Sequence, residues 1–142
     1  HFPGQFLIIP GQETRVGSQE VVELYLDIFR TFRFLAHPQS TYGFEPDLYG
    51  VQGIEVENFI HNPCIDHEEV SRIARHYNLL ELRNSDAHLL EELGSLYNCL
   101  ELEQLYCLGI DRNQEAKKPL QPPRLQAHGR IRIERGKNAE DH

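Results

Sequence analysis

The chain has 142 residues, a size that suits one domain, and 39% of them are apolar, which is enough for a modest core. The formal net charge is −8, which argues against broad nucleic-acid binding, because such binding depends on lysine and arginine neutralising phosphates. No apolar run approaches the roughly 18 residues that a membrane-spanning helix needs, and the first residues show no signal-peptide pattern.

Three cysteines, Cys64, Cys99 and Cys107, are irregularly spaced and form no CxxC pair. An odd number of cysteines without a paired spacing predicts free thiols in a reducing compartment, rather than a disulfide framework or a zinc knuckle. We therefore expect a cytoplasmic protein. The chain opens at His1 without a methionine, and an apolar segment follows almost at once, so we expect this sequence to be part of something longer.

The first 30 residues contain two predicted elements. Residues 6–9, FLII, form an apolar run closed by Pro10-Gly11, which is typical of a short buried strand. Ser18 is a suitable N-cap, and apolar residues then recur at helical spacing, so residues 19–30 are predicted to form an amphipathic helix. A strand is the alternative, because the VVELYL segment also carries residues that favour strands.

The next stretch consists of two short strands and one long loop. The strands are predicted at residues 34–36 and 53–58. The loop is predicted at residues 38–52 between them, which are rich in turn-forming residues. In the second of these strands Glu55 and Glu57 alternate, so only one of them can face the interior. Glu57 is the one that we expect in solvent.

A helix is predicted to follow, opened by Asp66, which forms a capping box with Glu69. Its buried stripe consists of Val70, Ile73, Ala74 and Tyr77. Residues 79–82 predict a fourth strand, and residues 89–96 predict a final helix.

Strands that alternate with helices are typical of βαβ units, so the predicted fold class is α/β with a parallel sheet or barrel. We assign this domain to residues 1–112. Residues 113–142 are polar and proline-rich at first, and they predict a tail with one edge strand at residues 130–134.

Ionisable side chains stand at or near the ends of these predicted strands. Glu13 follows the first strand, His37 ends the second, and Asp86 and His88 follow the fourth. Parallel strands bring their carboxyl ends to one edge of a sheet, where α/β folds carry their chemistry. Carboxylates and imidazoles that meet there can bind Zn, Mn, Fe or Mg. These four residues are therefore the predicted metal ligands, with Asp86 and His88 as the first candidates for catalysis.

Each of these residues alone also has a simpler explanation. Glu13 can be an ordinary surface residue, His37 can hydrogen-bond to the backbone at the strand end, and Asp86 can cap the following helix. Three further histidines are expected on the surface, away from this edge: His61, His67 and His76. No glycine-rich phosphate loop, HExxH or GxSxG motif occurs, and Ser85 is too close to Asp86 and His88 in sequence to form a serine-hydrolase triad.

Four segments occur in the order in which one known family carries them: IIPGQE (8–13), FLAHPQ (34–39), GIEVENFIHN (53–62) and NSDAH (84–88). Together with ELGSLY (92–97), they resemble the later motifs of the polymerase and histidinol phosphatase (PHP) superfamily. The resemblance implies part of a distorted (β/α) barrel of parallel strands, with two or three divalent metal ions at its carboxyl edge. The residues that match family metal ligands are Glu13, His37, Asp86 and His88. Glu55 and Asn58 match a segment whose role would be to support such ligands.

The resemblance further implies a metal-dependent phosphoesterase, in which the cations activate a water for attack on a small phosphorylated substrate. Two alternatives stay open. One is a catalytically incomplete domain of the same fold that acts as a scaffold or interaction module, and the other is a metal-dependent hydrolase of C–N bonds.

Two parts of the family pattern have no counterpart here. The HxH pair of the first family strand would lie before residue 1, and where a further family histidine is expected the chain has Gln19, Glu20 and Val21. Three explanations follow: the chain continues upstream, it is a reduced and inactive relative, or partner chains complete the barrel. Half a barrel leaves sheet edges unpaired, so we expect a homo-oligomer or an adjoining segment to cover them. Activity would require the missing ligand motifs in the full protein.

Overall fold

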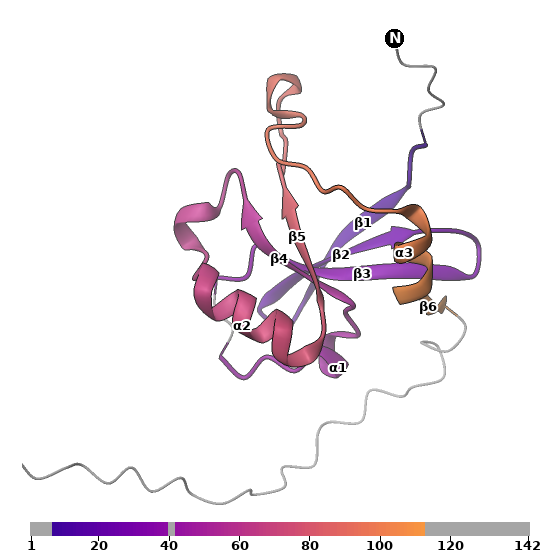
Figure 1. The fold of residues 1–142 in the computed structure, drawn as a ribbon, viewed down its shortest axis with the longest axis horizontal. Helices are drawn as coiled ribbons and strands as arrows, with labels where there is room; N and C mark the ends of the chain where they lie inside the picture. The colour runs from indigo at the N-terminus through magenta and orange to yellow at the C-terminus, as the bar shows by residue number, and fades with distance from the viewer. Residues whose placement is uncertain (1–6, 40–41, 113–142) are drawn as a thin grey trace, which may run out of the picture.

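The computed structural model describes residues 7–39 and 42–112. Six strands form one open sheet with the order β1-β2-β3-β4-β5, and β6 pairs with β3 (Figure 1). In chain order the elements are β1 (Gly11–Val16), β2 (Gln19–Tyr25), β3 (Arg30–Ala36), α1 (Pro46–Tyr49), β4 (Gly53–Asn58), α2 (His67–Tyr77), β5 (Leu80–Asn84), α3 (Leu102–Leu108) and β6 (Ile110–Asp111).

The sheet has an antiparallel part and a parallel part. The strands β1, β2 and β3 are antiparallel neighbours, whereas β3, β4 and β5 run parallel. The predicted α/β class is confirmed, but the expectation that parallel strands alternate throughout with helices is wrong for β1 and β2. The sheet is not closed, so a barrel of PHP type is not confirmed.

The predicted helix at residues 19–30 is wrong, because most of this segment is β2. Val21 faces the core on the α2 side of the sheet, and Val22 packs on the opposite side, so consecutive positions are apolar. A strand that is covered on both faces loses the alternation by which strands are recognised, and its pattern then resembles that of a helix. Gly17, with a φ of 63°, takes the first position of the two-residue turn between β1 and β2, where glycine is typical.

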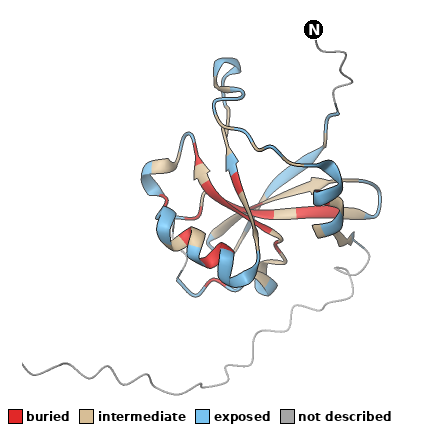
Figure 2. Ribbon diagram, viewed as in Figure 1, coloured by how far each residue is buried: buried red, intermediate tan, exposed pale blue. Residues whose placement is uncertain are grey.

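Each face of the sheet carries one apolar cluster: α2 and Tyr49 of the short α1 pack on one face, and α3 packs on the other. On one face, Val70 and Ile73 of α2 pack with Ile54 of β4. On the other, Leu105 of α3 packs with Phe32 of β3. Figure 2 shows buried residues concentrated along β3 and β4 and on the inner side of α2. The loops at the carboxyl ends of these two central strands therefore project from the most buried part of the sheet.

The helix predicted after residue 63 is confirmed as α2, with Asp66 as its N-cap accepting the backbone N–H of Glu69 at 3.1 Å. Only one of the two hydrogen bonds of the predicted capping box forms, because the Glu69 side chain pairs with Arg72 and not with the backbone of Asp66. Of the predicted buried stripe, Tyr77 is exposed. The predicted strand at residues 53–58 coincides with β4, and those at 34–36 and 79–82 lie in or against β3 and β5.

The predicted helix at residues 89–96 is wrong: only a 3-10 turn at Leu90–Glu92 forms. The segment between β5 and α3 extends away from the sheet (Figure 1), and Leu90 and Leu93 are exposed. Among the described residues, a helix there would therefore gain no packed apolar face to stabilise it. The turn is held instead by Glu92, whose carboxylate accepts the backbone N–H groups of His88 and Leu89. These two hydrogen bonds hold the pKa of Glu92 below its usual value.

Three other expectations concern the two ends of the chain and the absence of a membrane-spanning segment. The strand predicted at residues 6–9 is absent from its described residues 7–9, which precede β1. The predicted tail, with its edge strand at residues 130–134, lies outside the described residues. Of the helices in the described part of the chain, none combines the length and the apolar character that crossing a membrane requires.

Candidate metal centre

The carboxyl ends of β3, β4 and β5 lie at one edge of the sheet because these strands are parallel. His37 directly follows β3, His61 lies in the loop after β4, and Asp86 lies two residues after β5. The antiparallel β2 begins at the same edge, where Glu20 lies opposite Ala36. Residues far apart in the sequence are thus brought to one place by the strand directions.

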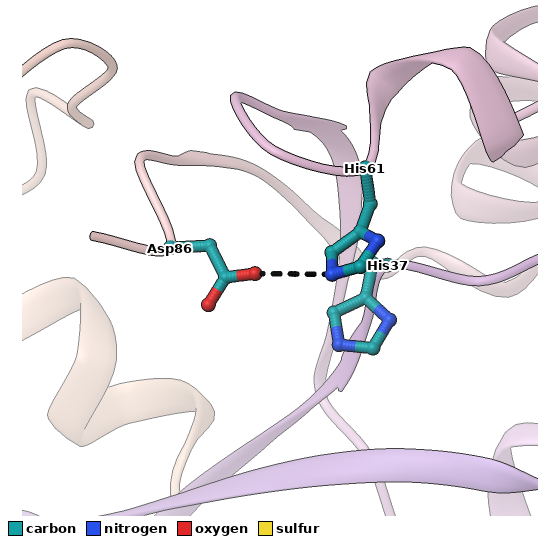
Figure 3. A group of neighbouring side chains, drawn as sticks. All are labelled: His37, His61 and Asp86. Atoms are coloured by element: carbon teal, nitrogen blue, oxygen red, sulfur yellow. Dashed lines mark ion pairs between the residues drawn. The ribbon is translucent and has the colours of Figure 1, made fainter. Parts of the chain in front are cut away.

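Two imidazoles and one carboxylate form a compact group at this edge (Figure 3). His37, His61 and Asp86 each offer a ligand atom, and these atoms lie within 4.8 Å of one another. The His61 Nε2 is 3.5 Å from the Asp86 Oδ2, and the two imidazole rings are 4.5 Å apart between centroids. All three side chains are half-buried, so water and small ligands can still reach them.

A second group of three shares His37 with the first. Glu13 Oε1 and Glu20 Oε2 lie 3.6 Å and 3.2 Å from the His37 Nε2. The other oxygen of Glu20 pairs with the guanidinium of Arg15, its neighbour across the β1–β2 hairpin. Arg15 holds the pKa of Glu20 below its usual value, and His37 and His61 act in the same direction. Glu20 is therefore kept ionised beside the histidine.

The carboxylate of Glu55 is buried beneath the centre, with the residue only 2% exposed, and it supports the centre through hydrogen bonds. Its Oε2 accepts the backbone N–H of His37 at 2.6 Å and an amide N–H of Asn58 at 3.0 Å, while its Oε1 accepts an amide N–H of Asn84 at 2.7 Å. A buried carboxylate is stable only when it is compensated in this way. The prediction that Glu55 faces the interior is confirmed, and Glu57 pairs at the surface with Arg83.

Asn58 positions the two remaining members of the first group. Its side-chain oxygen accepts the backbone N–H groups of Ile60 and His61 at 2.9 and 2.8 Å, an Asx turn that folds the loop back over the sheet edge. Its amide nitrogen lies 3.4 Å from the Asp86 Oδ2. One buried side chain thus connects the His61 loop, the Asp86 carboxylate and Glu55.

The backbone is strained at two members of this group. His37 and Asp86 have φ angles of 24° and 50°, in the left-handed region that favours glycine. The third described residue of this kind, Asn78, ends α2 in the usual left-handed cap. His37 and Asp86 have no such role, and strain of this kind is concentrated at functional sites, where the surrounding contacts hold it in place.

A pocket of about 180 Å³ opens beside the two groups. The polar residues of its lining include Glu13, His37, Asn84 and Asp86. The apolar residues of its lining are Val22, Phe34 and Ala36. The pocket therefore offers room for a small polar ligand directly against the candidate metal ligands.

The four residues singled out in the sequence are placed differently by the structure. Glu13, His37 and Asp86 lie at the common edge, whereas His88 is exposed and belongs to neither group found among the described residues. Its Nδ1 lies 2.8 Å from the backbone oxygen of Asp86, so it contacts the chain of Asp86 and not its carboxylate. The capping role considered for Asp86 has no helix to serve.

The structure adds two residues that sequence reasoning did not select. His61 was expected on the surface away from this edge, but the Asx turn of Asn58 brings it onto His37. The Asn-x-x-His spacing was the available signal, and it is weak. Glu20 stood in a segment interpreted as a helix, so its alignment with the start of β2 was missed.

The fold and the edge define an α/β domain with a candidate imidazole–carboxylate metal centre. Residues 65–104, which contain α2, β5, Asp86 and His88, match a family model described as PHP-associated. The resemblance to the C-terminal part of a PHP-superfamily domain is thereby confirmed. Neither curated proteins nor solved structures gave a match in the comparisons.

Proposed function

We propose that His37, His61 and Asp86 bind a divalent metal ion, and that the domain serves a metal-dependent phosphoesterase. The observation that carries the proposal is the meeting of three donors from three different strand ends within 4.8 Å. Two imidazoles and one carboxylate suit Zn, Mn or Fe, while the oxygen-rich group of Glu13 and Glu20 also suits Mg or Mn. A neutral imidazole has one free lone pair, so His37 would bind one cation, and the carboxylates of Glu13 and Glu20 would have to hold a second.

Each side chain has a distinct task in this proposal. When bound, a divalent cation polarises a phosphate oxygen and lowers the pKa of a water molecule. His37 and His61 supply neutral nitrogen ligands, and Asp86 supplies negative charge. Glu55 and Asn58 hold the ligands in position through the hydrogen bonds described above. The adjoining pocket would receive a small phosphate ester, with its organic part against Val22 and Phe34.

The test is calorimetric titration of the chain with Zn²⁺ and with Mn²⁺, followed by elemental analysis. We expect at least one ion per chain, and we expect His61→Ala and Asp86→Ala each to weaken binding by about 100-fold or more, because each removes a ligand. His76→Ala on α2 is the matched control and should leave the affinity unchanged. His88→Ala tests the prediction from sequence: a loss equal to that of His61→Ala would make His88 a ligand as well.

A scaffold without metal is the second candidate, favoured by the open sheet, whose edges within the described residues are β1 and β5. For a scaffold we expect no bound metal, and Asp86→Ala should leave the structure intact. If metal does bind, a panel of phosphomonoesters, phosphodiesters and amides separates a phosphoesterase from a hydrolase of C–N bonds. Absence of metal in the wild-type chain would refute the phosphoesterase proposal.

A further inference from the structure

Arg15 lies against the second group of ligands. Its Nη2 pairs with the Glu20 Oε1, and the Glu20 Oε2 faces His37 at 3.2 Å. Glu13 is two residues before Arg15 on β1, so both side chains leave the strand on the same face. A guanidinium is thus placed beside carboxylates that are candidates for holding cations.

Most of this guanidinium is open to a ligand. The Arg15 side chain is 70% exposed, and its contact with Glu20 uses one of the five N–H donors of an arginine. The fork of remaining donors matches the spacing of two phosphate oxygens, which is why arginine is common where phosphate is recognised.

The charges at this edge explain why a cation-loaded site would need such a residue. In their ionised forms, Glu13, Glu20, Glu55 and Asp86 carry four negative charges, and Arg15 carries one positive charge. The site without metal therefore repels a phosphate. With two divalent cations bound, the net charge of these groups becomes +1. Without Arg15 it would be zero, so Arg15 supplies the positive charge that attracts a phosphate.

We infer that Arg15 binds the phosphate group of the substrate, alongside the cations held by Glu13, Glu20, His37, His61 and Asp86. This inference rests on the proposed function. Before phosphate binds, Glu20 holds the Arg15 guanidinium beside the site. When a phosphate dianion binds, it accepts hydrogen bonds from the N–H groups of Arg15 that Glu20 does not use.

The test is calorimetric titration of inorganic phosphate into the 142-residue chain saturated with Zn²⁺. Arg15→Gln should weaken phosphate binding by about tenfold, the usual effect of losing one charge-assisted hydrogen-bond partner. The phosphate affinity of Arg15→Lys should lie between that of the wild type and that of Arg15→Gln. The Zn²⁺ affinity of both variants should stay close to that of the wild type. Arg72→Gln is the matched control, because Arg72 is also exposed and paired with a glutamate, but on α2.

Glu20→Gln separates recognition of phosphate from mere positioning of Glu20. If Arg15 binds phosphate, this variant loses Zn²⁺ affinity yet keeps its phosphate affinity once it is saturated with Zn²⁺. If Arg15 only orients Glu20, Arg15→Gln at saturating Zn²⁺ binds phosphate as the wild type does, and the inference is overturned. A wild-type chain that binds neither Zn²⁺ nor Mn²⁺ overturns the proposed function, and the inference with it.

Discussion

The Glu55 carboxylate offers the sharpest test of how the centre is held together. In Glu55→Gln, the amide oxygen can keep the two contacts now made by the Oε2, to the backbone of His37 and to Asn58. The new amide NH₂ then faces the NH₂ of Asn84. Asn84 cannot simply turn over, because its own oxygen accepts an N–H of Asn98 at 2.8 Å. One buried donor is therefore left without a partner.

The size of the effect follows from these contacts. An unpaired buried donor costs about 1–3 kcal/mol, and the two retained hydrogen bonds lose the strength that the charge gives them. Relief from burying a charge offsets part of this loss. We expect a net decrease of about 2 kcal/mol in the free energy of unfolding, which lowers the urea midpoint by about 1 M.

The assay is urea unfolding followed by circular dichroism, with Glu57→Gln as the control. Glu57 is on the same strand, and its ion pair with Arg83 is at the surface, where such pairs contribute about 0–1 kcal/mol. If Glu55→Gln lowered the midpoint no more than Glu57→Gln does, the reasoning about the buried network would be refuted.

Three further predictions concern other parts of the molecule. Gly53→Ala should destabilise the fold by about 1–3 kcal/mol, because the added methyl group would lie 2.9 Å from the ring of the fully buried Phe32. A thermal melting temperature equal to that of the wild type would contradict this. Asp66→Ala should cost about 1 kcal/mol by removing the N-cap of α2, measured by urea unfolding, and Asp66→Asn should restore most of it. Arg15→Gln should raise the pKa of Glu20, followed by carboxyl NMR. Because the folded-state pKa of Glu20 is lowered in the wild type, the small stability that it contributes is present above the usual glutamate range and is lost as the pH falls through the lowered pKa.

The sequence by itself determined the elements whose signals are local. The strand β4 has the predicted bounds, and α2 begins at the predicted cap Asp66, because a capping side chain and a helical apolar stripe act within a few residues. It also selected His37 and Asp86, because polar residues that follow strands are visible in the order of residues along the chain. Glu13 was selected on the same ground, but the structure places it within β1 and not at a strand end.

Only the tertiary structure decided the rest. The segment at residues 19–25 became a strand because β1 and β3 pair with it from both sides. Residues 89–96 did not become a helix, because Leu90 and Leu93 stay exposed in the part of the chain that the structure describes. His61 reached His37 through one turn made by Asn58, whereas His88 remained outside the cluster. Which side chains share a site depends on strand direction and loop geometry, and these are set by contacts between residues far apart in the sequence.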